Sequence, residues 1–290
     1  MSKIAQALEK AAKDRLKSWQ QLPTVSYEPS KLASSKLDQH AVAYFDPKSP
    51  IAEQYRILRS NLMALNRQRP PQVLVLTSAI HQEGKSLTAT NLSVVLAQSQ
   101  NRRVLLIDAD MRKGTLKKLF ALDSQPGLSE VLQGKVEMES VLLRTDVQQL
   151  TLLLAGRTPT HPAELLESDR MKGLVEEMRK RFDMVVIDAP PIASISDAGL
   201  IARYTDGVVL VVQAGRTQRK LVIRSYELLQ QMQVTVLGFV MTHADYYVPY
   251  YHYYQKYYGS HQDREAARPD GEEGQATVED AAEPGREVLQ

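Results

Sequence analysis

This chain of 290 residues contains no cysteine, which excludes disulfide bonds and thiolate metal sites and suits a reducing cytosol. No uninterrupted apolar run reaches the roughly 18 residues that a membrane span requires, and no signal peptide is apparent. An excess of one charge is also missing, because the net charge is only +2, so there is no electrostatic reason to expect nucleic acid as a partner. We expect a cytoplasmic protein whose association with a membrane comes through a partner.

The residues that are present favour a parallel α/β fold. Hydrophobic residues make up 43% and charged residues 24% of the chain, as in ordinary soluble domains. From Gln72 onward, runs of Val, Ile and Leu alternate with helix-like segments, which is typical of a doubly wound, mostly parallel sheet with strands buried on both faces. The predicted strands are Val73–Leu76, Val104–Ile107, Leu150–Leu154, Met184–Ile187, Val208–Val212 and Val236–Met241. The predicted helices between them span residues 87–99, 113–120, 128–134, 163–181, 196–203 and 218–232.

The stretch Val73–Leu87 organises the rest of the chain. An apolar strand is followed by a polar turn ending in Gly84, Lys85 and Ser86, and then by a helical segment. This order is similar to a phosphate loop, in which a glycine lets backbone N–H groups surround a phosphate, the lysine reaches the outer phosphates and the hydroxyl binds Mg²⁺. Ala79 stands where the usual pattern has its first glycine, so an ordinary strand-to-helix turn is the alternative interpretation.

Two further strands end in aspartates. Asp108 and Asp110 follow the second predicted strand, and Asp188 follows the strand Met184–Ile187. One such aspartate is often a helix cap, but carboxyl ends of parallel strands share one edge of a sheet, where ligands bind. Because carboxylate oxygens are ligands that Mg²⁺ prefers, the three carboxylates beside the loop predict a magnesium–nucleotide site and a P-loop NTPase-like fold.

Both ends of the chain are predicted to be extensions. Residues 1–20 read as a basic amphipathic helix, which either packs on the main domain or docks on a membrane partner or bilayer, and residues 21–47 read as a linker. Residues 246–258 hold eight of the 13 tyrosines. A buried cluster would leave eight hydroxyls needing partners, so we expect an exposed segment rather than core or a surface that stacks nucleic-acid bases. Residues 259–290 are acidic and predicted to be disordered.

A helix is predicted over residues 51–66. It carries Glu53, Arg56 and Arg59 at three-residue spacing, which places these charges along one side. Taken alone, this spacing is typical of a solvated charged face.

Together these features resemble the bacterial tyrosine kinases of exopolysaccharide and capsule synthesis. The resemblance covers about residues 46–258 and includes Glu53–Asn61, Ile107–Arg112, Pro162–Leu166, Phe182–Pro191 and the tyrosine cluster. It implies that the kinase domain spans residues 46–245, between a helix and linker at 1–45, a tyrosine cluster at 246–258 and an acidic tail at 259–290. In that family, Glu-x-x-Arg-x-x-Arg mediates assembly into a ring, so Glu53, Arg56 and Arg59 are expected at subunit contacts.

The resemblance also implies an activity. ATP and Mg²⁺ would be bound, and the chain would phosphorylate its own tyrosines between subunits, thereby regulating polysaccharide polymerisation and export with a separate membrane co-polymerase. The expected catalytic residues are Lys85, Asp108 and Asp110, and the expected metal ligands are Ser86, Asp110 and Asp188. Nucleotide contacts are expected from Gln82, Glu83, Gly84, Lys85, Ser86, Leu87 and Thr242. The expected acceptors are Tyr246, Tyr247, Tyr250, Tyr251, Tyr253, Tyr254, Tyr257 and Tyr258.

Two positions depart from the family pattern. Gln82 replaces a glycine of the loop, which strains the backbone if that position needs a positive φ. Thr242 stands where an asparagine commonly reads adenine, which affects base specificity. The alternatives are a partitioning or division-site ATPase of the MinD/ParA type, or a catalytically weak nucleotide-binding regulator of the polysaccharide machinery. ATPases of the first kind usually carry an extra lysine where this chain has Ala79 and Ile80.

Overall fold

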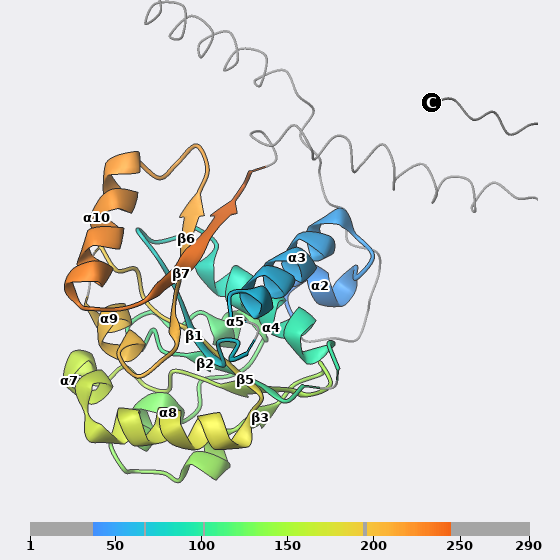
Figure 1. Ribbon diagram of the computed structural model, residues 1–290. Coiled ribbons are helices and arrows are strands. Elements are labelled where there is room, and N and C mark those ends of the chain that lie inside the picture. Colours follow the sequence, from blue (N-terminus) through green and yellow to red (C-terminus); the bar gives the residue numbers. More distant parts are fainter. Residues whose placement is uncertain (1–36, 67, 101, 194–195, 245–290) are drawn as a thin grey trace, which may run out of the picture. The chain divides into compact units, whose positions relative to one another are not determined.

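The computed structural model describes residues 37–66, 68–100, 102–193 and 196–244, in which one sheet carries helices on both faces (Figure 1). The strand order is β3-β4-β2-β5-β1-β6-β7, and all neighbours pair in parallel except β3 and β4. The strands are β1 Val73–Ser78, β2 Val104–Asp108, β3 Leu143–Arg144, β4 Leu150–Leu153, β5 Met184–Asp188, β6 Gly207–Gln213 and β7 Val236–Thr242. The predicted doubly wound, mostly parallel sheet is confirmed.

Alternate side chains of the strands pack against the two helical layers. Leu74 and Leu76 of β1 join the core beneath α2 to α5, whereas Val73 and Val75 join the core beneath α6 to α10. The helices are α2 Val42–Phe45, α3 Pro50–Ala64, α4 Lys85–Ala97, α5 Leu116–Leu119, α6 Leu128–Leu132, α7 Pro162–Glu167, α8 Asp169–Arg181, α9 Asp197–Ala202 and α10 Arg219–Gln231, with a 3₁₀ turn, η1, at Met138–Val141. Burial on both faces therefore follows from the uninterrupted apolar runs.

Three elements differ from the sequence-based expectations. Residues 37–47, expected to be linker, contain α2, which packs on α4, and bury Leu37, Ala43 and Phe45 in the same core. The single helix predicted over 163–181 is two helices, because Ser168 adopts an extended conformation and caps α8 by accepting from the Met171 N–H. The two-residue strand β3 was not predicted, since it is too short to carry a pattern.

Strand β7 is also less buried than predicted. It lies at an edge of the sheet, and Phe239 and Met241 are 54% and 59% exposed. The expectation that every strand is buried on both faces is therefore wrong for β7, because the side chains of this edge strand lie at the margin of the helical layers.

The sheet brings the chemical residues to one edge. Asp108 ends β2 and Asp188 ends β5, and these two positions are direct partners in the parallel ladder. Strand β1 lies on the other side of β5 and leads into the loop before α4. The helices among the described residues are all too short or too polar to cross a bilayer. The helix predicted at 1–20 and the segments 246–258 and 259–290 lie outside the described residues.

Candidate active site

The loop between β1 and α4 makes two left-handed turns. Gly84 has φ of +85°, and a Cβ added there would lie 3.3 Å from Cγ2 of Thr242. Gln82 has φ of 64°, so the position where a glycine was expected does need a positive φ. Arg216, which lies between β6 and α10, donates a hydrogen bond of 2.7 Å from Nη1 to the Gln82 carbonyl oxygen. The loop thus keeps a strained backbone that a neighbouring guanidinium holds in place.

Glu83 supports the same loop from inside. Its carboxylate is fully buried and accepts hydrogen bonds from the Ile80 N–H at 2.7 Å, the Gln213 N–H at 3.3 Å and the Thr217 hydroxyl. The Thr242 hydroxyl donates to the Glu83 carbonyl oxygen at 2.8 Å. Both residues were expected to contact nucleotide, and that expectation stays a prediction. In the structure their side chains hold the loop in shape.

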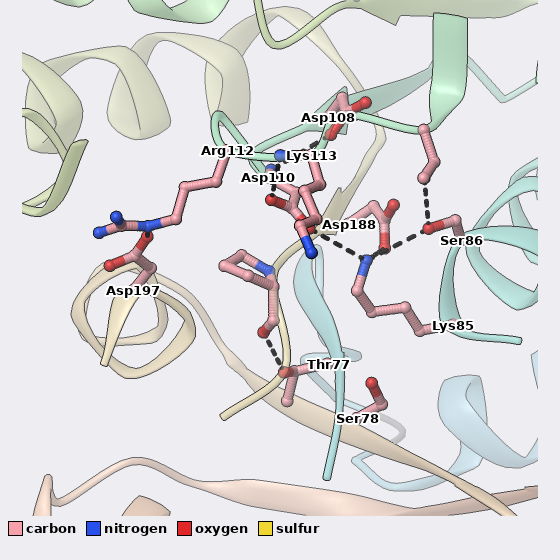
Figure 2. Close-up of polar contacts among 12 residues, drawn as sticks. Thr77, Ser78, Lys85, Ser86, Asp108, Asp110, Arg112, Lys113, Asp188 and Asp197 are labelled. Atoms are coloured by element: carbon pink, nitrogen blue, oxygen red, sulfur yellow. Dashed lines mark hydrogen bonds and ion pairs between the residues drawn. The ribbon is translucent and has the colours of Figure 1, made fainter. Parts of the chain in front are cut away.

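Lys85 occupies the centre of the site (Figure 2). Its Nζ lies 3.0 Å from Asp188 Oδ1, 3.2 Å from Ser86 Oγ and 3.9 Å from Asp110 Oδ2. Burial lowers the pKa of Lys85, but the charges of Asp188 and Asp110 outweigh burial, so the pKa lies above its ordinary value. Lys85 is therefore a permanent positive charge at the start of α4, where backbone N–H groups also favour an anion.

Asp108, which ends β2, and Asp110, two residues later, fix the segment that follows them. Asp108 accepts hydrogen bonds from the Asp110 N–H at 3.1 Å and the Leu116 N–H at 3.0 Å, while Asp110 Oδ1 accepts from the Lys113 N–H at 2.9 Å. Burial, and next the charge of Asp188, raise the pKa of Asp108 to about 7. A carboxyl group with a pKa near neutrality suits proton exchange.

Asp188 has capacity left for a cation. Its side chain is fully buried, and Oδ2 has no hydrogen-bond partner although Oδ1 faces Lys85. A buried carboxylate oxygen without a partner is costly, and a divalent cation would satisfy it. Within the described part of the chain, no three Asp, Glu or His side chains converge closely enough to hold a metal by themselves. A Mg²⁺ ion at Ser86, Asp110 and Asp188 would therefore need phosphate oxygens and water as further ligands, which is its usual preference.

The structure also shows polar contacts at the site that the sequence did not predict. Thr115 donates a hydrogen bond of 2.7 Å to Ser86 Oγ. Arg112 turns away from Lys85, and its Nε lies 3.1 Å from Oδ2 of the buried Asp197 at the start of α9 (Figure 2). Asp197 follows no strand and belongs to no motif, so only the fold brings it to Arg112.

A cavity of about 830 Å³ opens at this edge. Gly84, Lys85, Ser86 and Leu87 line it, as do the backbone and side chains of residues 110–115 and part of the segment 154–158. Gln82 and Asp108 also border the cavity, whereas the lining contains neither Glu83, Asp188 nor Thr242. The volume lies in the range of sites for cofactor-sized molecules.

The charged residues of α3 are bound within the chain. Arg56 contacts Glu53 Oε2 at 2.9 Å and donates to the Pro47 carbonyl oxygen. Arg59 donates a hydrogen bond of 2.8 Å from Nη1 to the Val95 carbonyl oxygen of α4. The three side chains thus lie along one side of the helix, as the spacing predicts, but Arg59 ties α3 to α4 instead of only facing solvent.

The eight tyrosines expected to accept phosphate all lie outside the described residues. These are Tyr246, Tyr247, Tyr250, Tyr251, Tyr253, Tyr254, Tyr257 and Tyr258.

A phosphate loop beside aspartates at the ends of parallel strands defines a protein of the P-loop NTPase fold. A family model described as an AAA domain matches residues 80–235. The tyrosine-protein kinase YwqD of Bacillus subtilis is 39% identical over 211 residues, which cover 73% of this chain and 89% of that protein. The tyrosine-protein kinase ptk of Acinetobacter johnsonii is 38% identical over 190 residues, or 65% of this chain and 26% of that protein.

A solved structure, the kinase domain of the Escherichia coli tyrosine kinase ETK, agrees with these relatives. It is 30% identical, has a TM-score of 0.65, and the match covers 77% of this chain and 84% of that one. The chain belongs to the family of bacterial tyrosine kinases.

Proposed function

We propose that this chain transfers the γ-phosphoryl group of ATP to tyrosines 246–258 of a neighbouring copy of itself. The observation that carries the proposal is that Asp108, a carboxyl group with a near-neutral pKa, and the buried Lys85 both line one nucleotide-sized cavity. Family membership supports the same reaction. The acceptor site and the transfer between copies are the finer parts that experiment has to test.

In this reaction a bond forms between the tyrosine oxygen and the γ-phosphorus, and the bond to the β,γ-bridging oxygen breaks, so that ADP leaves. Asp108 would take the phenolic proton, because a phenol has a pKa of about 10 and needs such help at neutral pH. Lys85 would exchange its contact with Asp188 for the phosphates, which frees that carboxylate. Mg²⁺, held by Ser86, Asp110 and Asp188, would neutralise phosphate charge as it forms.

A described tyrosine near the loop is a poor acceptor. Burial raises the pKa of Tyr55 in α3, whose hydroxyl lies near Thr88 and Asn91 of α4. A hydroxyl buried in this way cannot reach the γ-phosphate without unpacking α3 from α4. The proposal therefore assigns the phosphate to the C-terminal cluster.

We also propose that the reaction serves polysaccharide export. A membrane co-polymerase, encoded separately, would bind the kinase, recruit it from the cytoplasm to the inner face of the membrane and activate it. Phosphorylation of the cluster would then regulate polymerisation of a capsule or exopolysaccharide. Family membership supports this role, and measuring kinase activity with and without the cytosolic segment of such a co-polymerase tests it.

The central experiment mixes two complementary variants. Lys85→Met removes the positive charge that faces the phosphates but keeps all acceptors, whereas a variant with the eight cluster tyrosines changed to Phe keeps the catalytic residues. Neither protein alone should incorporate phosphate from Mg²⁺-ATP into the cluster. The mixture should label only the Lys85→Met chain, which mass spectrometry of phosphopeptides identifies.

Label on Tyr44 or Tyr55 would contradict the assigned acceptors. If wild-type protein labels its cluster but the mixture stays unlabelled, transfer occurs within one copy, which would contradict transfer between copies. Wild-type protein that binds ATP and forms no phosphotyrosine would support the weak nucleotide-binding regulator instead.

A further inference from the structure

The cavity has a basic wall beyond the phosphate loop. The segment that follows Asp110 lines it next to the loop and presents the side chains of Lys113, Lys117 and Lys118, which we call the lysine wall. Lys113 and Lys118 are exposed, and Lys117 is half-buried. None of the three is needed for the contacts that hold Lys85, so the reaction described above leaves them without a role.

These lysines carry uncompensated charge. Among the described residues, none of the three has a carboxylate within ion-pair distance, and Lys117 Nζ donates only to the Ser124 hydroxyl at 3.1 Å. Asp38, the acidic residue that borders the cavity away from the catalytic carboxylates, is bound to His40 at 2.7 Å. The wall therefore attracts anions, and because these lysines are solvent-accessible, that attraction should weaken as salt is added.

The wall is also held at a fixed position relative to the catalytic groups. The backbone N–H of Lys113 donates to Asp110, and that of Leu116 donates to Asp108. Thr115, between them, donates to Ser86. A ligand on the lysine wall would therefore be positioned against the same residues that hold the nucleotide and accept the proton.

We propose that the lysine wall binds an anionic group next to the acceptor tyrosine, so that a tyrosine flanked by negative charge is the preferred substrate. The inference rests on the proposed function and names its substrate class. The sequence can supply such a group, because each tyrosine of the cluster has another tyrosine beside it that can carry a phosphate. The adjacent pairs are Tyr246–Tyr247, Tyr250–Tyr251, Tyr253–Tyr254 and Tyr257–Tyr258.

When one tyrosine of a pair is phosphorylated, its phosphate is on the residue next in sequence to the remaining acceptor tyrosine. It adds about −1.5 to −2 charges at neutral pH, more than one carboxylate does. The lysine wall would hold this phosphate while Asp108 accepts the proton of the neighbouring tyrosine. The first phosphorylation of a pair therefore promotes the second.

The test compares three peptides from the cluster, each with one acceptor tyrosine flanked by phosphotyrosine, by Glu or by Phe. For wild type, kcat/KM should rank phosphotyrosine above Glu above Phe. In the variant Lys113→Ala, Lys117→Ala, Lys118→Ala, the ratio of the phosphotyrosine to the Phe peptide should fall about tenfold, because each of the three exposed charge pairs contributes about twofold. The control changes Lys135, Lys172 and Lys180 to Ala, which removes the same charge away from the cavity.

Three results would overturn the inference: equal rates on all peptides in wild type, an unchanged ratio in the wall variant, or a wall variant whose only defect is a raised KM for ATP. A raised KM for ATP alone would show that these lysines bind the nucleotide and not the peptide. Binding of the same peptides without ATP, measured by fluorescence anisotropy, separates this inference from the proposed function. If the protein had no kinase activity but bound the phosphotyrosine peptide through these lysines, the anion-binding role of the lysine wall would be supported and the proposed kinase reaction would be rejected.

Discussion

At the scale of single residues, Asp108 has two tasks that one substitution can separate. Its oxygens order the backbone at Asp110 and Leu116, and its raised pKa suits it to accept a proton. Asparagine keeps the size and one acceptor oxygen but cannot take the proton, and its NH₂ group faces one of the two backbone N–H groups. The pH dependence of the rate, which a lost hydrogen bond would not produce, therefore distinguishes the chemical role from the structural one.

We expect Asp108→Asn to lower kcat by at least about 100-fold with little change in the dissociation constant of ATP, since loss of a general base typically costs that much. Because burial and the charge of Asp188 raise the pKa of Asp108 to about 7, kcat/KM of wild type should rise with pH through that value as the carboxylate forms. The variant should lack this rise. Peptide phosphorylation between pH 5.5 and 8.5 measures it, and near wild-type rates in the variant would remove Asp108 from its assigned role.

Gln82 and Arg216 form a pair whose coupling is measurable. Gln82 holds a left-handed φ of 64°, and Arg216 binds its carbonyl oxygen. We expect Arg216→Ala to raise the KM for ATP about threefold, because the loop loses a charged hydrogen bond at an exposed site. In a Gln82→Gly background the same change should matter less, since glycine adopts this φ without strain. Arg219→Ala, an exposed charge nearby without a described contact, is the control, and equal effects of Arg216→Ala in both backgrounds would contradict the coupling.

At the scale of elements, β1 is fixed at both ends, and the end remote from the site depends on Asp206. This carboxylate accepts from the N–H groups of Gln72 and Val73, both at 2.8 Å, and from Arg179 at 2.7 Å. Partial burial alone would raise its pKa, but these hydrogen bonds outweigh burial and hold the pKa below its ordinary value.

Asp206→Asn should lower the free energy of unfolding by about 1–2 kcal/mol at pH 7, since the contact is charged but reached by solvent. A lowered pKa means that the stabilisation is present above the unfolded value near 3.8 and is lost as pH falls through the lower folded value. Urea unfolding should therefore give a difference at pH 7 that shrinks toward pH 3. The KM for ATP of the folded variant should not change, and a difference that grew on acidification would contradict this account.

The elements also show what a sequence can reveal. Uninterrupted apolar runs located six of the seven strands, and the aspartates that end them located the site edge, because both features are local in the chain. The break at Ser168 and the packed segment 37–47 depend on caps and tertiary contacts that no period in the sequence encodes. The same reason hid Thr115, Arg216 and Asp197, whose partners are 29 to 134 residues away or reached only across the sheet.

At the scale of the whole molecule, the charges of α3 are the candidates for subunit contacts. We expect unphosphorylated protein, such as Lys85→Met, to form a large oligomer and phosphorylated wild type to be mostly monomer, because repeated phosphates on the cluster repel one another. Arg56→Ala with Arg59→Ala should be monomeric in either state. Light scattering, with and without the cytosolic segment of a co-polymerase, measures the mass, and one mass for all forms would exclude the mechanism.

Arg59 requires a control in that experiment because it holds the Val95 carbonyl oxygen inside its own chain. Arg56→Ala alone keeps this contact and removes a charge that otherwise pairs with Glu53. If assembly depends on subunit contacts, Arg56→Ala should dissociate the oligomer without lowering the melting temperature by more than a few degrees. A double variant that is monomeric only because it unfolds would show a lower melting temperature as well.

Helix α4 begins at the phosphate site and packs against α3, which carries the charges expected at subunit contacts. It begins with Lys85, its Val95 carbonyl oxygen holds Arg59 of α3, and Asn91 binds the backbone before and within α2. If assembly through α3 favours the arrangement of α4 that binds nucleotide, then nucleotide must favour assembly by the same factor, because the two equilibria share one free energy of coupling. The fraction of sites that hold ATP would then depend on the local concentration of the kinase. At the same ATP concentration, more of the copies gathered by a partner would bind ATP than of the dispersed copies.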